Sequence, residues 1–303
     1  MTNPVSSLLA GRRLPSPGRL AAWGALGTML LVTLLPLWFV VKTALMPHAA
    51  LFEHSASLLP VDATLANFQR VLGLLSKDDS LKLGGSGADI NFARALGNSL
   101  LFTGIVVVLQ ISSSAMAAYA FARLRFPGRS TLFALFVASM MVPGVVTFIP
   151  NFVLMKELGW LNTMAGMVAP FCLMQGFSMF FLRQFFLSIP RDLEEAAVLD
   201  GAGHLYVFFR IVLPLSVTPL ATIAMLTGIN MWNEFFWPYL VARDEALQVL
   251  PVALQTFKAQ TPQGQPDWTG LMAAAAIAVL PTILLLVGFG RRVVESVQFS
   301  GGK

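Results

Sequence analysis

Long runs of residues without any Asp, Glu, Lys or Arg divide this sequence into regular blocks. A helix needs roughly 20 apolar residues to cross the hydrocarbon core of a membrane, and six runs reach this length. Backbone in lipid must satisfy its own hydrogen bonds, which favours helices over open strands. A proline is tolerated as a kink in such a helix because neighbouring helices supply other partners for the freed backbone groups. The pattern therefore predicts six transmembrane helices, over residues 20–41, 95–122, 130–155, 158–182, 211–233 and 268–290.

The composition excludes most other classes of protein. Hydrophobic residues make up 56% of the 303 positions and charged residues only 12%, whereas a soluble domain carries about 25% charged residues. Disordered chains are poor in apolar residues, so these figures exclude disorder as well. In so apolar a chain, a net charge of +5 is more typical of basic cytoplasmic loops than of nucleic-acid binding. The single Cys172 lies in an apolar run and is expected to be a small buried side chain.

The charges also predict which side each connection faces. Residues 1–21, 123–129, 183–210 and 291–303 hold 12 Lys and Arg and 5 acids, whereas 42–94, 156–157 and 234–267 hold 8 bases and 10 acids. Basic residues in short loops stay in the cytoplasm, so both termini are predicted to be cytoplasmic. The first span is longer than the apolar core of a signal peptide and lacks a clear cleavage site, which favours an uncleaved anchor.

The sequence carries no motif for chemistry of its own. The Gly-Gly-Lys ending at residues 301–303 is followed by no helix that could receive a phosphate, and the glycine-rich stretch 84–87 lacks a lysine. His48, His54 and His204 are scattered along the chain, so no metal site is expected. The predicted spans are free of charge, which argues against a proton relay. Any uphill transport would need an energy source on another chain.

The predicted cytoplasmic loop 185–215 is the most informative segment. Asp192 and Glu195 have the spacing of a capping box for a helix that starts at Leu193, and Gly201 is suited to end that helix. A second short helical run is predicted from Leu205 to Arg210. Its neighbouring side chains at 207–209 are apolar, and two interpretations are equally favoured: they cover the membrane core, or they bind a partner.

Here the sequence resembles a known family. Glu195-Ala196-Ala197, then Gly201, then Ile211-Val212-Leu213-Pro214 match the EAA motif of binding-protein-dependent ABC importer permeases. The fuller string over 194–202 is similar to the carbohydrate-uptake branch. The strings at 232–238 and 250–252 and the Gly-Gly-Lys ending also resemble the MalG-like permeases of that branch.

The resemblance implies a fold and a set of partners. The fold would be an all-α integral membrane protein with six transmembrane helices, the type I (MetI-like) permease fold, with N and C termini in the cytoplasm. The resemblance also implies a second, non-identical permease, two ATPase subunits that bind ATP and Mg, and an extracytoplasmic sugar-binding protein, in a bacterial or archaeal cytoplasmic membrane. No cofactor is expected on this chain. The domains would be a leader (1–21), one permease domain (22–292, with external loops 47–93 and 235–267) and a tail (293–303).

The resemblance also assigns roles to particular residues, position by position. The small residues of the EAA loop would let its helix enter a cleft on the ATPase, where Glu195 can accept charge-assisted hydrogen bonds. The ATPase-coupling residues would be Glu195, Ala196, Ala197, Asp200, Gly201, Ala202, Leu213 and Pro214. Contacts to the binding protein would come from Gln255, Phe257 and Lys258, although an ordinary surface loop is an equally good interpretation.

Substrate contacts are expected of polar or aromatic side chains in the spans, because sugars bind amides and aromatic faces. The candidates are Gln175, Asn230, Trp232 and Asn233. For each of them, hydrogen bonding between helices or anchoring at the membrane interface is the favoured interpretation. The resemblance implies that the chain is the permease subunit of an ATP-driven importer of carbohydrates, of the oligosaccharide, maltose or trehalose type, and forms half of the translocation pathway. Two alternatives for the function stay open: a permease of this architecture for glycerol 3-phosphate or another polyol, and an ATP-independent channel or secondary carrier.

Overall fold

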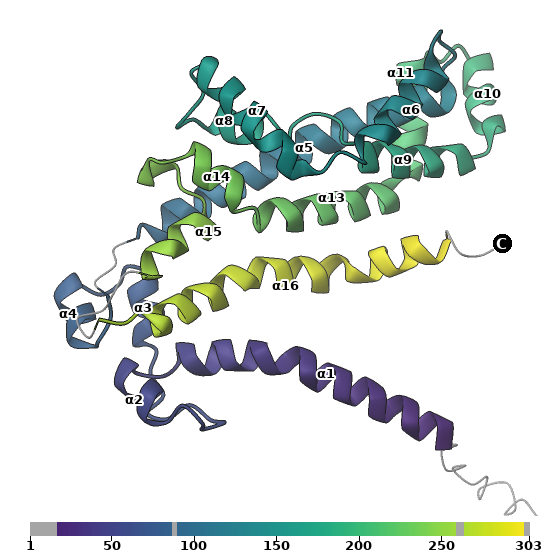
Figure 1. The fold of residues 1–303 in the computed structure, drawn as a ribbon. Helices are drawn as coiled ribbons and strands as arrows, with labels where there is room; N and C mark the ends of the chain where they lie inside the picture. Colours follow the sequence, from purple (N-terminus) through teal and green to yellow (C-terminus); the bar gives the residue numbers. More distant parts are fainter. Residues whose placement is uncertain (1–16, 87–89, 259–263, 300–303) are drawn as a thin grey trace, which may run out of the picture.

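Three long helices set the shape of the molecule (Figure 1). The structure is a computed structural model that describes residues 17–86, 90–258 and 264–299. The three are α1 (Pro17–Ala44), α5 (Phe92–Arg123) and α16 (Trp268–Phe299). Each contains an apolar stretch long enough to cross a membrane. The regular secondary structure of the described residues is helical throughout, as the apolar pattern predicted.

Two of the predicted spans are bent. Helices α6 (Arg129–Ser139) and α7 (Gly144–Glu157) meet at 99°, with Pro143 at the start of α7. The run of α11 (His204–Val207), the π-helical turn η1 (Phe208–Val212) and α12 (Leu213–Leu215) meets α13 (Val217–Trp232) at 78°. The sequence predicted one span over each of 130–155 and 211–233, and neither is a single straight helix.

The prediction of a single helix over 158–182 is wrong. This stretch contains only the short α8 (Met164–Val168) before α9 starts (Gly176–Ser188). Thr163 caps α8 and Gln175 caps α9, each by accepting a backbone N–H with its side-chain oxygen. Such caps start new helices inside an apolar run, where a count of charges cannot detect them. The described residues therefore hold three straight candidate spans, or up to five if each bent pair counts as one.

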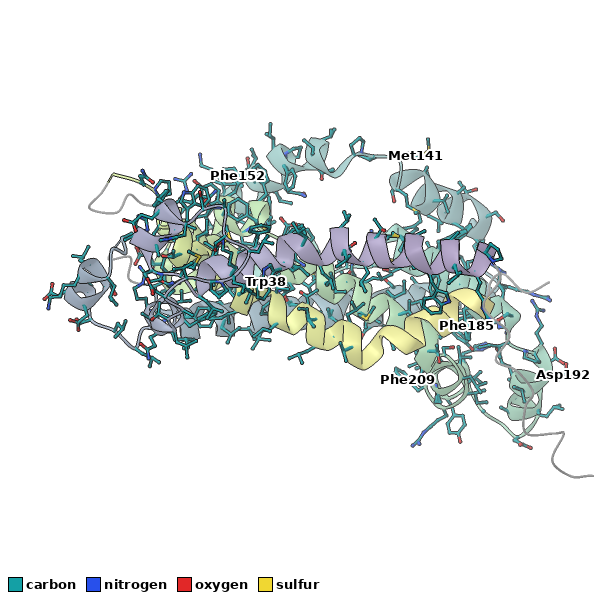
Figure 2. The ribbon with its side chains drawn as sticks, turned by 90° about the horizontal axis from the view of Figure 1, so that it is seen from below. Trp38, Met141, Phe152, Phe185, Asp192 and Phe209 are labelled. Atoms are coloured by element: carbon teal, nitrogen blue, oxygen red, sulfur yellow. The ribbon has the colours of Figure 1, made fainter. Side chains whose placement is uncertain are left out.

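Helix α5 is the centre of the packing. It contacts α9 through its C-terminal part and also contacts α13, while α16 packs between α13 and α1. The buried residues form one cluster at the end near α9 and α11, one at the opposite end and one midway along α5. Elsewhere large apolar side chains are exposed, such as Trp38 on α1 and Met141 at the α6–α7 bend (Figure 2). A surface so rich in exposed apolar groups fits a lipid environment.

Short helices build the end of the molecule that lies opposite α10 and α11 in Figure 1. They are α2 (His48–Glu53), α3 (Ala66–Val71) and α4 (Lys77–Lys82) in the first connection. A later connection supplies α14 (Phe236–Val241), η2 (Glu245–Leu247), α15 (Leu250–Ala253) and η3 (Leu254–Lys258). Asn98 on α5 pins this later connection by donating to the carbonyl oxygens of Ala246 and Gln248.

A buried ion pair joins the first connection to the start of α16. The Nη1 of Arg70 donates to Oδ2 of Asp267 at 2.6 Å, and the two side chains are 4% and 0% exposed. The other carboxylate oxygen of Asp267 accepts the backbone N–H of Gly270 in the first turn of α16. Gly85 passes so close to Arg70 that any Cβ would overlap the guanidinium. We call Arg70, Asp267 and Asn67 the outer network. Asn67 accepts a hydrogen bond from Arg70 and donates one to the carbonyl oxygen of Ala44 at the end of α1.

Candidate functional site

The segment that carries the matched motif forms a helical hairpin at one end of the bundle. Helix α10 (Arg191–Leu199) follows α9 after the two extended residues Ile189 and Pro190. It starts two residues before the predicted Leu193, and Pro190 occupies its N-cap without a side-chain hydrogen bond. The predicted capping box is therefore wrong. Proline at this point turns the chain, and Asp192 in the first turn favours the helix through its dipole instead.

Gly201 ends α10, as predicted. Its φ is +89°, a conformation that glycine adopts with no steric cost. The N–H of Gly201 donates to the Val198 carbonyl at 3.0 Å, and the N–H of Ala202 donates to the Ala197 carbonyl at 2.9 Å. These two bonds make a Schellman motif, which satisfies the last carbonyls of the helix. The turn fixes the direction in which α11 leaves α10.

The surface of the hairpin has a buried and an exposed side. Ala197 and Ala202 are half-buried and pack against the core cluster, whereas Glu195, Ala196, Asp200 and Gly201 are exposed. Leu199 is 89% exposed, so this apolar side chain has no cover among the described residues. Beyond α11, Leu213 is half-buried and Pro214 is exposed at the start of α12. The motif residues therefore lie together around one exposed helix.

The apolar side chains at 207–209, at the end of α11 and just beyond it, divide between the two interpretations left open above. Val207 and Phe208 are buried in the core cluster, and the ring of Phe208 lies 5.2 Å from that of Tyr119 on α5. Phe209 is 55% exposed. Two of the three side chains thus fold back onto the helical core and anchor the hairpin, while the third remains on the surface.

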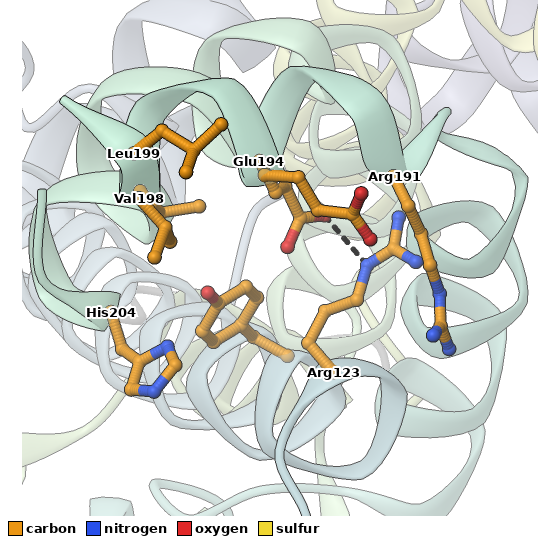
Figure 3. A pocket seen from close by; sticks show the side chains of 9 residues that line it. Arg123, Arg191, Glu194, Val198, Leu199 and His204 are labelled. Carbon is orange, nitrogen blue, oxygen red and sulfur yellow. Dashed lines mark ion pairs between the residues drawn. The ribbon is translucent and has the colours of Figure 1, made fainter.

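A hollow of about 440 Å³ lies between the hairpin and the end of α5 (Figure 3). Its wall includes an ion pair between Arg123 Nε, on α5, and Glu194 Oε1, on α10, at 2.7 Å. The side chains are 6% and 13% exposed, and the two atoms lack the angles of a hydrogen bond. The remaining lining residues are Tyr119, Arg191, Glu195, Val198, Leu199, His204 and Val207.

The candidate substrate residues do not form one site. Trp232 is buried and its indole N–H donates to the Ala278 carbonyl on α16, so it joins two helices. Asn233 is exposed and donates to the Ile229 carbonyl one turn back, and Asn230 is exposed. Gln175 caps α9. Helix-to-helix bonding is therefore the better description of Trp232.

The three candidates for contact with a binding protein differ in exposure. Phe257 is 1% exposed and belongs to the buried cluster that includes Ala44 and Phe92. Its ring stabilises this connection from inside, so the expected surface role does not fit it. Gln255 is half-buried and Lys258 is exposed, which leaves Lys258 as the accessible member. The resemblance also implies that the tail, residues 298–303, contacts the ATPase subunits, and residues 300–303 lie outside the described part of the chain.

Arg123 and the outer network are the interactions that the sequence analysis missed. Arg123 entered that analysis only as a positive charge in a short loop. Its place directly after the predicted span 95–122 indicates an arginine near a helix end, where such side chains commonly bond terminal carbonyls, but it does not indicate that the carbonyls would belong to α9. No comparable signal existed for Arg70 and Asp267, because no spacing rule relates positions so distant in sequence.

Comparison with known proteins places this arrangement in a family. Residues 110–298 match the family described as "Binding-protein-dependent transport system inner membrane component". The arabinooligosaccharides transport system permease protein AraQ of Halalkalibacterium halodurans is 34% identical over 68% of this chain and 73% of its own length. The sn-glycerol-3-phosphate transport system permease protein UgpE of Salmonella typhi is 30% identical over 87% and 90%.

A solved structure shows the same architecture. A chain of a bacterial ABC transporter involved in the import of the acidic polysaccharide alginate superimposes with a TM-score of 0.77 at 25% identity. The match covers 90% of this chain and 95% of that one. The match to the family spans the hairpin, the bent helices and α16, which together make up most of the fold. The chain therefore belongs to the family of inner membrane components of binding-protein-dependent transport systems.

Proposed function

We propose that this chain is the permease subunit of an ATP-driven importer of carbohydrates and forms half of the translocation pathway. The observation that carries the proposal is the exposed α10 hairpin, which holds the matched motif at one end of an apolar helical bundle. Its exposed Glu195, Ala196 and Leu199 form a small protruding surface that suits a cleft on an ATPase subunit. ATP and Mg would bind to that subunit, and this chain would not be an enzyme.

The remaining partners are assigned to other surfaces. A second, non-identical permease would pack against the exposed apolar faces of α5 and α13. A sugar-binding protein would dock at the opposite end of the molecule from α10, where Lys258 and half-buried Gln255 are found. That end would face the outside of a bacterial or archaeal cytoplasmic membrane. Asn230, Asn233 and Gln175 remain candidates for the substrate path because they are exposed polar groups on or beside helices.

The relatives support sugars as the class of substrate. They include permeases for arabinooligosaccharides and for diacetylchitobiose, and the structural neighbour belongs to an importer of a polysaccharide. Permeases for sn-glycerol 3-phosphate match over a comparable share of the chain, so this phosphorylated polyol is the second candidate. An ATP-independent carrier is disfavoured because the chain's matched motif sits on a hairpin suited to an ATPase.

Reconstitution in liposomes tests the proposal. The full complex, with its ATPase, second permease and binding protein, should accumulate a labelled oligosaccharide only when ATP is supplied, whereas this chain alone should give no flux. Concentrative uptake by the chain alone would overturn the assignment as a subunit. Uptake of glycerol 3-phosphate in place of oligosaccharides would favour the second candidate.

A variant pair tests the role of the hairpin. Gly201→Asp adds a charged side chain to the exposed turn, where a Cβ has no neighbour within 4 Å and where Asp tolerates the left-handed backbone better than most residues. It should leave the complex assembled but lower uptake per ATP hydrolysed by about tenfold or more. Gly128→Asp is the control, since Gly128 has a φ of +77° and equal space before α6. If both variants show the same uptake per ATP hydrolysed, Gly201 has no coupling role.

A further inference from the structure

Arg123 occupies the corner between α9 and α10. Its Nη2 donates to the carbonyl oxygens of Phe186 at 2.8 Å and Ile189 at 2.6 Å. These carbonyls belong to the last turn of α9 and to its C-cap. The Nε of the same guanidinium lies 2.7 Å from Oε1 of Glu194 on α10. One side chain of α5 therefore contacts both helices on either side of the Ile189–Pro190 turn.

The surroundings make this contact selective for an arginine. Both charged side chains are largely buried, and the attraction in such a pair is screened much less than in an exposed one. A guanidinium presents several donors in a fixed plane, whereas an ammonium is a single compact centre. The fixed plane of the guanidinium lets Nη2 bond two carbonyl oxygens while Nε faces the carboxylate.

The end of α5 that carries Arg123 is itself fixed. Arg129, at the start of α6, donates to the carbonyl oxygens of Phe121 and Leu124. Arg183 on α9 also donates to Phe121, and its guanidinium lies 4.1 Å from the centre of the Phe133 ring on α6. These bonds tie α5, α6 and α9 together at this end. Helix α10 is attached to them through the short Ile189–Pro190 turn, the ion pair with Arg123 and the buried side chains beyond α11.

We propose that Arg123 is a positioning residue that sets the angle of α10 against α9 and transmits displacement of α10 to α5. The inference rests on the proposed function, in which α10 docks on an ATPase subunit. When α10 moves, Glu194 carries the guanidinium with it, and the carbonyl bonds to Phe186 and Ile189 make α9 follow. Without Arg123, α10 still docks, but its movement is absorbed by the Ile189–Pro190 turn.

Uptake and ATP hydrolysis by the reconstituted complex provide the first test. Arg123→Gln should keep assembly and binding-protein-stimulated ATP hydrolysis within about twofold of the wild type but lower uptake per ATP by about tenfold, within the usual range of coupling between sites. Glu194→Gln, which keeps the carbonyl bonds, and Arg123→Lys, which keeps the charge, should each give a smaller loss. Arg125→Gln is the matched control, because Arg125 is exposed, and it should behave as the wild type.

Each outcome decides the inference. Unchanged uptake per ATP in Arg123→Gln overturns it. So does an equal loss of assembly, hydrolysis and uptake, since that pattern indicates a residue needed only for folding. If the wild-type complex itself shows no ATP-dependent uptake, the proposed function fails, and the distance measurement below decides the role of Arg123 independently.

A distance measurement tests the same residue without transport. Spin labels at Asp192→Cys on α10 and Arg125→Cys beyond α5, in a Cys172→Ser background, report the position of α10 in the purified complex. Both side chains are exposed. The distribution should be narrow with Arg123 present and should broaden in Arg123→Gln while circular dichroism stays unchanged. A distribution of equal width in both proteins overturns the positioning role.

Discussion

The guanidinium groups of Arg129 and Arg183 both donate to the carbonyl oxygen of Phe121, near the end of α5. The final carbonyls of a helix have no partner within it, and arginine side chains can supply the missing donors. The same residues contribute to the excess of positive charge that predicts the cytoplasmic side. Each arginine thus supplies a hydrogen-bond donor to a helix end, although in the sequence it stands out only as a positive charge.

The outer network yields a stability prediction at the scale of single residues. Arg70→Gln leaves the fully buried carboxylate of Asp267 without its cation, and breaking a buried ion pair in this way costs about 3–5 kcal/mol. Thermal unfolding of the purified chain in detergent should detect the loss. Lys82→Gln is the control, because Lys82 and Asp79 form an exposed pair at 3.5 Å and such pairs contribute about 0–1 kcal/mol. Similar unfolding temperatures for both variants would contradict the importance of the buried pair.

The same network predicts the pH dependence of the unfolding temperature. Burial raises the pKa of Asp267, but the hydrogen bonds and charge of Arg70, with the N–H groups of Ser86 and Gly270, outweigh burial and hold that pKa below its usual range. A depressed pKa in the folded state stabilises the protein above the unfolded value of about 3.9, and the stabilisation is lost as the pH falls through the folded value. Without Arg70, burial of Asp267 is no longer outweighed, so the pKa of this carboxyl rises and the variant binds the proton at a higher pH than the wild type does. The difference in unfolding temperature between wild type and Arg70→Gln should therefore be largest at neutral pH and shrink as the pH falls through the acidic range.

At the scale of elements, the pattern of apolar runs predicted the long helices and missed the breaks. The runs at 20–41, 95–122 and 268–290 correspond to α1, α5 and α16. The failure at 158–182 has a local cause: polar caps at Thr163 and Gln175 start new helices, and Pro170 between them offers no N–H. A window that averages hydropathy is insensitive to these single residues. The hairpin was found because its motif combines helix formers with a glycine stop.

The faces of α5 and α13 carry a prediction about association. Two neighbouring apolar hollows, of about 610 and 430 Å³, share the small residues Ala221 and Ala224 of α13. Small residues let helices approach closely in membranes. Ala221→Phe should fill this space without disturbing the chain's own fold, and it should weaken copurification with the second permease by about tenfold or more, as expected when a central contact is lost.

The control for this variant makes the same change elsewhere. Ala138 is exposed on α6, so Ala138→Phe should leave copurification at the wild-type level. If Ala221→Phe also copurifies normally, the second permease does not use this face.

At the scale of the whole molecule, α10, the start of α1 and the end of α16 lie at one end in Figure 1, and α2, α3 and α4 lie at the other. The charge count assigns the first end to the cytoplasm. In a Cys172→Ser background, a membrane-impermeant maleimide should label Leu59→Cys in intact cells and Arg125→Cys only after permeabilisation. Both side chains are exposed. The reverse pattern would show that the predicted orientation is wrong.

The contact between Arg70 and Asp267 has a consequence for building chimeric proteins. The stretch that matches the family begins at residue 110, within α5, so Arg70 precedes that stretch and Asp267 lies inside it. The ion pair thus connects the part of the chain before residue 110 to the part after it, and a chimera could take each part from a different relative. A transplanted amino-terminal part that brings no cation to this point would bury a lone carboxylate at the first turn of α16. Compatible grafts should therefore be chosen by this pair of residues rather than by overall identity.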